Sequence, residues 1–153
     1  MSLTDVSKIV EWGVGVRLDR VKDIELILLK GHLMLEVGIN HAIRTLAGVA
    51  CKSSDFSFHR KLHVLENYIP SARPDFGRAL VHLRSLNKLR NRLAHELTFE
   101  DVSSAFGLWS DEVLADFPGT KVCRNTFRTK IIRAIGALIT VLIDPRRLPE
   151  EVE

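Results

Sequence analysis

Several features that would narrow the function are scarce or missing in this chain of 153 residues. Its two cysteines, Cys51 and Cys123, are too few for a disulfide framework or a thiolate metal cluster, so we expect reduced thiols. Aromatic residues make up only 7%, so the core must be mainly aliphatic. No basic segment followed by an apolar stretch opens the chain, so no signal peptide is expected. These absences favour a cytoplasmic protein.

Long hydrophobic runs and most catalytic motifs are missing as well. The most apolar stretch, IIRAIGALITVLI at 131–143, contains Arg133 and is shorter than the about 20 residues that span a bilayer, so we expect no membrane partner. No glycine-rich phosphate loop and no Ser-His-Asp arrangement is visible. His59 and His63 have the spacing of metal ligands, but no nearby carboxylate or cysteine completes a site. We therefore predict neither metal nor cofactor.

Helical periodicity is what the chain has in abundance. The spacing of apolar residues predicts four main helices, at 19–47, 57–69, 76–97 and 122–143. Two short helices are predicted at 4–13 and 98–107, the second with a capping box made by Thr98 and Asp101. Because no strand alternation is found, the predicted fold is all-α, an up-and-down helical bundle of four main helices plus short extra helices.

Nothing in the sequence divides this bundle into domains. No repeat, low-complexity tract or linker interrupts the chain, so we predict one domain over 1–153, with a frayed tail from about 145. Within the longest helix, Gly31 and Gly38 are seven residues apart and so lie on one face. Two missing side chains on that face predict close approach of another helix. Since the helix is apolar on most sides, we expect a homodimer.

The stretch LRNRLAHEL at 89–97 is unusual for a core-forming helix. Leu89, Leu93 and Leu97 recur every fourth residue, yet cationic and hydrogen-bonding side chains crowd between them. On a helical wheel, Arg90 falls only about 30–40° from the centre of the apolar stripe. A guanidinium near the core requires a carboxylate, phosphate or carbonyl partner. The alternative is that Arg90 lays its stem over the core while His95 is simply exposed near a helix end.

Asn91 and His95 are four residues apart and share another face of the same helix. Arg90 and His95 lie about 140° apart on an ideal helix, so they do not automatically meet. They would converge if Arg90 extends along the helix, if the helix loosens near His95, or if two copies face each other across a symmetric interface.

The segment RNRLAH, from Arg90 to His95, resembles the Arg-x4-6-His motif of the HEPN superfamily, including the polar residue after the arginine. The layout of an all-helical chain with this motif late in a helix is also similar to that family. The segments LLKGHLMLEVGINHAI and FHRKLHVLE resemble bacterial stand-alone members, including mannitol repressor-like proteins. The layout covers most of the chain, whereas the motif itself covers six residues.

This resemblance implies one of two functional classes. Many HEPN proteins are metal-independent endoribonucleases, often toxins or defence effectors, which act as dimers with the motif at a shared cleft. Others keep the fold as non-catalytic binding or regulatory modules. Carried over to this chain, Arg90 and His95 would be the catalytic pair and Asn91 a supporting residue. Arg92 occupies a variable position of the motif and inherits no role.

The residue types fit cleavage of RNA by its own 2′-hydroxyl. His95 suits general acid or base catalysis near neutral pH, and the Arg90 fork matches two oxygens of a crowded phosphorane. On the long helix, Glu36 and His32 form part of a polar ridge from which an acid could pair with Arg90 or orient His95. That ridge reads equally well as a solvated stripe.

The partners implied by the two classes differ. A nuclease takes RNA as substrate and, if it is a toxin, an antitoxin. A regulatory module binds a protein or a nucleic acid. The intact Arg-Asn-x3-His pattern favours the nuclease, whereas the modest net charge of +3 and the lack of an aromatic stacking platform near the motif favour the module.

Overall fold

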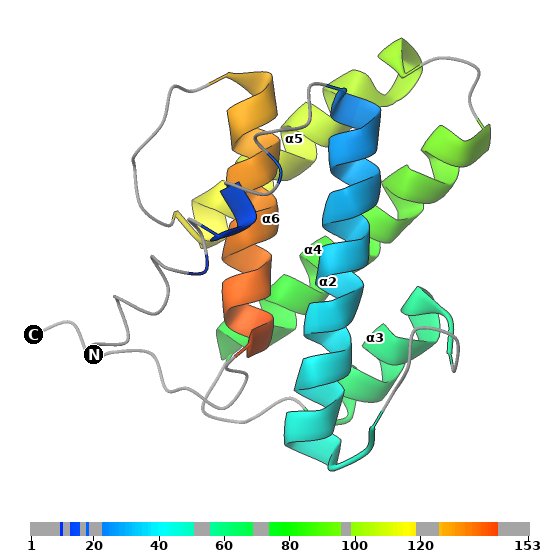
Figure 1. The fold of residues 1–153 in the computed structure, drawn as a ribbon, viewed down its shortest axis with the longest axis vertical. Helices are drawn as coiled ribbons and strands as arrows, with labels where there is room; N and C mark the ends of the chain where they lie inside the picture. Colours follow the sequence, from blue (N-terminus) through cyan, green and yellow to red (C-terminus); the bar gives the residue numbers. More distant parts are fainter. Residues whose placement is uncertain are drawn as a thin grey trace, which may run out of the picture.

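The computed structural model describes residues 10, 13–15, 18, 23–50, 56–68, 74–95, 99–118 and 126–143. Five helices with defined bounds lie in these ranges, and no strand occurs in them (Figure 1). The helices are α2 (Ile24–Ala47), α3 (Phe58–Glu66), α4 (Pro74–His95), α5 (Glu100–Asp116) and α6 (Phe127–Ile143). The predicted all-α helical bundle is confirmed. The predicted tail from 145 and nearly all of the predicted 4–13 helix lie outside the described residues.

Helix α2 is delimited by a cap at each end. Asp23 has an extended backbone, and its side-chain oxygen accepts hydrogen bonds from the amides of Glu25 and Leu26, at 2.8 and 3.4 Å. The predicted start at residue 19 was therefore wrong, because an N-cap residue stands outside the helix. The predicted end at residue 47 is confirmed. Gly48 follows in the left-handed region, with φ of 71°, and its amide donates to the Arg44 carbonyl.

The glycine face of α2 is used inside the molecule. A Cβ added to Gly31 would collide with the side chain of Ile135, and one added to Gly38 would lie 3.2 Å from Cδ1 of Leu142. The predicted close approach is thus confirmed, and the approaching helix is α6 of the same chain. This face is consequently not available to a second copy, so the homodimer prediction must rest on another surface.

Helices α3 and α5 differ in length from the helices predicted for those segments. Helix α3 is a short helix of nine residues, capped by Ser57, whereas the predicted short helix at 98–107 is the 17-residue α5. Helix α5 runs past Gly107 because its buried row continues with Trp109 and Val113. Phe99 is its N-cap and makes no side-chain cap bond, while Thr98 lies outside the described residues.

Helices α4 and α6 organise the rest of the bundle. Helix α4 begins at Pro74, two residues before the predicted start, since proline is tolerated at the first helical position. It crosses behind α2, and its C-terminal end extends beyond that helix (Figure 1). Helix α6 packs against α2 and α5 and is buried on most sides. It begins at Phe127 rather than at 122, after a cap in which the Thr129 hydroxyl accepts from the Thr126 amide at 3.0 Å.

By length and composition alone, α2 is apolar enough to cross a bilayer. Half of its most apolar window is buried inside the molecule, and the core helix of a soluble protein passes the same test. The buried half faces α6, α3 and α4. The other half includes a row of exposed aliphatic side chains.

Candidate functional site

The Arg90–His95 motif occupies the last turns of α4, where the helix leaves the bundle (Figure 1). The side chains of Arg90, Asn91 and His95 are all exposed. By helical spacing, Arg90 continues the stripe formed by Leu83 and Leu86, which are at most 1% exposed. We placed Arg90 near the core from this spacing. It is exposed instead.

Arg90 has no carboxylate ion-pair partner among the described residues. Its positive charge acts on His32 of α2, so the two side chains are close enough to interact electrostatically. An exposed guanidinium with no carboxylate to neutralise it is available to bind an anion.

His32 is the most unusual polar residue near the motif. It is 4% exposed and stacks on Phe58 of α3, with ring centroids 4.2 Å apart. Burial lowers the pKa of His32 below its ordinary value, and the charge of Arg90 lowers this pKa further. A hydrogen bond with Asn87 and the negative charge of Glu36 raise it, without reversing the shift. The Nε2 atom is buried and has no hydrogen-bond partner among the residues that the structure describes.

Glu36 forms an ion pair with Lys61, a residue that the sequence analysis did not single out. Lys61 of α3 is fully buried, and its Nζ donates to Oε1 of Glu36 at 3.1 Å. The sequence left open whether Glu36 pairs with Arg90 or orients His95, or belongs to a solvated stripe, and in the structure it pairs with Lys61. The signal was present, because Lys61 lies three residues after Phe58 and four before Leu65, on the apolar face of its helix.

Within one chain, Arg90 and His95 are not joined. No hydrogen bond or ion pair between described residues links His95 to Arg90, Glu36 or His32. The two motif residues are about 7.5 Å apart along the helix axis and about 140° apart around it. Asn91 shares the face of His95. The motif therefore offers its arginine and its histidine to solvent on two sides of the same helix end.

Other cationic residues and histidines are distributed around the bundle. His63 is exposed and lies 3.4 Å from Glu66, and the described residues contain no group of three or more potential metal ligands. Lys130 pairs with Asp111 at 2.9 Å, and Arg133 donates to the Pro118 carbonyl at 3.1 Å. These two cations hold α6 against α5 and its C-terminal end. Lys30 and Arg44 are exposed on α2.

A second buried histidine links α4 to α5. Nε2 of His82 lies 2.6 Å from Oδ2 of Asp116, whose other oxygen is 3.7 Å from Arg78. The indole of Trp109 donates to the His82 carbonyl at 2.9 Å. Sequence reasoning missed this pair, although His82 lies three residues after the buried Ala79 on the core side of the predicted helix. These contacts fix the buried half of α4 and lie away from the motif end.

Comparisons with known proteins do not assign this site. No protein-family model, no curated protein and no solved structure matches the chain. The functional assignment therefore rests on the residues themselves and on the motif resemblance.

Proposed function

We propose that the protein is a metal-independent endoribonuclease of the HEPN type, with Arg90, Asn91 and His95 as its functional residues. The observation that carries the proposal is the exposure of all three on a helix end that projects from the bundle. Among the described residues Arg90 has no carboxylate partner, which leaves its guanidinium free for a phosphate.

The chemistry follows from the groups that RNA and the motif supply. His95 removes the proton of a 2′-hydroxyl, whose oxygen attacks the adjacent phosphorus and displaces the 5′-oxygen. The leaving oxygen takes a proton, so the products are a 2′,3′-cyclic phosphate and a 5′-hydroxyl. Arg90 donates hydrogen bonds to the non-bridging oxygens as negative charge builds on them. Asn91 shares the face of His95 and contacts the ring or the RNA backbone.

A second copy would complete the site. One histidine serves one of the two proton transfers, and a second His95 from another protomer would serve the other. The last turns of α4 offer a surface for this, since Leu93 is only partly buried and Ala94 is exposed. We place this activity in the cytoplasm, where an antitoxin or another regulatory protein would inhibit it.

The second candidate is a non-catalytic binding or regulatory module, as in mannitol repressor-like proteins. One observation favours it: within the described part of the chain, no hydrogen bond orients the His95 ring. Catalytic imidazoles are usually held in one tautomer and orientation by such a bond. In this class, the cationic helix end would bind a partner without cleaving it.

Cleavage of single-stranded RNA in the presence of EDTA tests the proposal. His95→Ala should abolish cleavage, Arg90→Ala should reduce it by about 100-fold or more, and Asn91→Ala should have an intermediate effect. Arg92→Ala is the matched control, because it removes one exposed cation from the same turn without touching the motif pair. RNA with a 2′-O-methyl group at the cut site should resist cleavage.

Two results would contradict the nuclease. Equal cleavage by wild type and by His95→Ala would identify a contaminating enzyme. RNA binding that Arg90→Ala weakens, with no cleavage by any variant, would favour the binding module instead.

A further inference from the structure

The outward face of α2 carries a regular row of exposed residues that no described helix covers. Every fourth residue from 25 to 41 belongs to it, and this α2 ridge consists of Glu25, Leu29, Leu33, Val37 and His41. Its three aliphatic members are 45%, 53% and 65% exposed. Residues spaced by four form one of the ridges by which helices pack on each other. Three large aliphatic side chains in such a row are a contact surface without a described occupant.

A groove lies beside the ridge, between α2 and α6. It has a volume of about 510 Å³, and it is lined by Leu33, Met34, Val37, Gly38, His41, Ile139 and Ile143. Ile143, which is 38% exposed, forms part of its wall. An apolar ridge next to an apolar groove is what a ridge-into-groove contact requires from each of its two partners.

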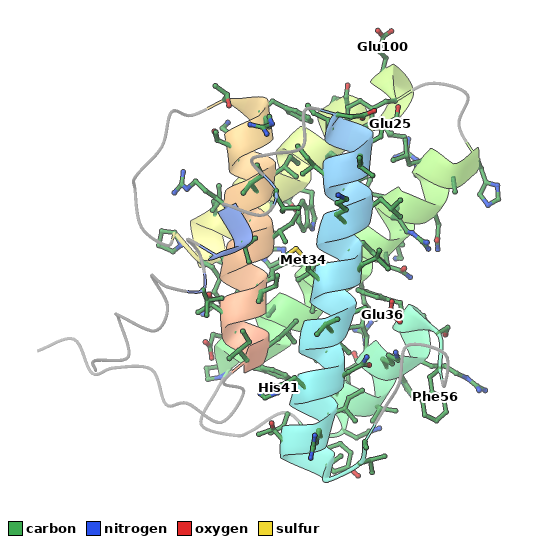
Figure 2. The ribbon with its side chains drawn as sticks, viewed as in Figure 1. Glu25, Met34, Glu36, His41, Phe56 and Glu100 are labelled. Carbon is green, nitrogen blue, oxygen red and sulfur yellow. The ribbon has the colours of Figure 1, made fainter. Side chains whose placement is uncertain are left out.

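The residues on this face are arranged symmetrically about Leu33, with an acidic residue toward the start of α2 and basic residues toward its end. Glu25 stands eight residues before Leu33, and His41 stands eight residues after it. Leu29 and Val37 are likewise four residues before and four residues after. Glu25 and His41 lie near opposite ends of α2 (Figure 2). Beyond them, Asp23 and Arg44 extend the same order, acidic at the start of the helix and basic at its end, and both are exposed.

We propose that the α2 ridge docks against the α2 ridge of a second copy of this chain, antiparallel, about a two-fold axis at Leu33. Leu33 then meets its own counterpart, each Leu29 meets a Val37, and each Glu25 meets the His41–Arg44 end of the other copy. An isologous contact needs this self-complementarity, which a lipid surface or an unrelated helix would not require. Nε2 of His41 donates to the Ile143 carbonyl at 2.9 Å within its own chain, which leaves the exposed Arg44 as the charged group that Glu25 meets.

This contact is independent of the proposed nuclease site. His32 and Asn87 mark the side of α2 that faces α4, whereas the ridge lies on the outward side. Figure 1 shows α4 crossing α2 from behind, so a copy docked on the ridge keeps α4 on the outside. It does not bring a second His95 to the first. A chain that also paired its α4 ends would associate beyond a dimer.

Sedimentation of purified full-length protein at micromolar concentration tests the proposal. Wild type should sediment as a dimer or a larger species, and Leu33→Asp should weaken the association at least about tenfold. The matched control is Val81→Asp, which places a carboxylate at an aliphatic residue of α4 that is 58% exposed. This control should keep the wild-type mass, and circular dichroism should show that both variants are folded.

Charge exchange and cross-linking sharpen the geometry. Glu25→Lys should weaken the dimer, and Glu25→Lys combined with His41→Glu should restore it, because each new lysine then meets a new glutamate. With Cys51 and Cys123 changed to serine, Leu33→Cys should form a disulfide-linked dimer on mild oxidation, since the residue lies on the axis. Leu108→Cys, at a position on α5 that is 61% exposed, should not.

Three outcomes would overturn the proposal. A strictly monomeric wild type rules out this docking. A dimer that survives Leu33→Asp but is lost on Leu93→Asp belongs to the α4 end. Binding of a monomeric wild type to vesicles of anionic phospholipid, lost in Leu33→Asp, identifies the ridge as a membrane contact. RNA cleavage by a ridge variant would leave the proposed nuclease intact, so the two proposals can fail separately.

Discussion

The two halves of α4 carry the same apolar stripe in opposite surroundings. In the first half, Phe76, Ala79 and Leu83 are completely buried among α3, α5 and α6. In the last turns, Leu93 is only partly buried, and Arg90, which continues the stripe, is exposed. The comparison teaches that helical periodicity reports which side of a helix a residue lies on. It does not report whether another helix is present on that side.

Substitutions along this stripe should reproduce the difference. Leu83→Ala should lower the free energy of unfolding by about 3–4 kcal/mol, because it leaves a cavity in a packed core. Leu93→Ala, the same change on the projecting half, should cost about 1 kcal/mol or less. Urea denaturation of the two variants measures both values, and similar costs would mean that the end of α4 is covered in solution.

Two cationic residues show the same contrast between burial and exposure. Lys61 of α3 is buried and paired, whereas Arg90 at the end of α4 is exposed. Glu36→Ala should destabilise the protein by about 3 kcal/mol, because it removes the carboxylate that the buried ammonium faces. The low end of the usual range applies, since the Glu36 side chain is 15% exposed. Glu66→Ala, which removes the partner of the partly exposed Arg84, serves as the control and should cost far less. Equal losses would contradict the special role of Lys61.

His32 lies between the two regions and should make stability depend on pH. Because its folded pKa lies below 6.5, its ordinary value, the unfolded chain takes up a proton first as the pH falls. Stability should therefore be unaffected above about pH 7 and decrease below about pH 6.5, by at most about 1.4 kcal/mol per pH unit. Urea unfolding of wild type and of His32→Gln should be measured at about pH 7 and at values below about pH 6.5. The variant should lose the pH dependence of stability that His32 causes.

Arg90→Ala tests the second cause of the lowered His32 pKa, the nearby positive charge. Without that charge, the loss of stability on acidification should be smaller. A profile that His32→Gln leaves unchanged would assign the pH dependence to another group.

The smallest effect is expected for Arg90 itself. With Arg90 exposed and lacking a carboxylate partner among the described residues, Arg90→Ala should change the free energy of unfolding by no more than about 0.5 kcal/mol. The sequence-based prediction that Arg90 lies near the core would imply a larger loss of stability, because the substitution would leave a buried partner unpaired. A loss of about 2 kcal/mol or more in thermal or urea unfolding would mean that a neighbouring copy covers the helix end.

Local interactions account for what the sequence predicted well. The helical class and the end of α2 before Gly48 depend on periodicity and capping, which adjacent residues decide. The small size of Gly31 and Gly38 predicted where another helix could approach, although not which one. Two of the features that the sequence did not predict required long-range contacts. Helix α5 continues past Gly107 because Trp109 and Val113 are buried in the core, and Lys61 lies inside the core because Glu36 of another helix pairs with it.

The sequence by itself determined that the chain is helical, that Arg90, Asn91 and His95 lie within two turns of one helix, and that α2 is apolar on most sides, because these properties follow from residue type and a fixed rise per residue. Only the tertiary structure decided which of those sides are covered. The crossing of α4 behind α2 leaves the motif in solvent, and the packing of α6 on the glycines leaves the α2 ridge exposed. The physical reason is that burial depends on how helices cross and where each one ends, and these are set by side chains far apart in the sequence.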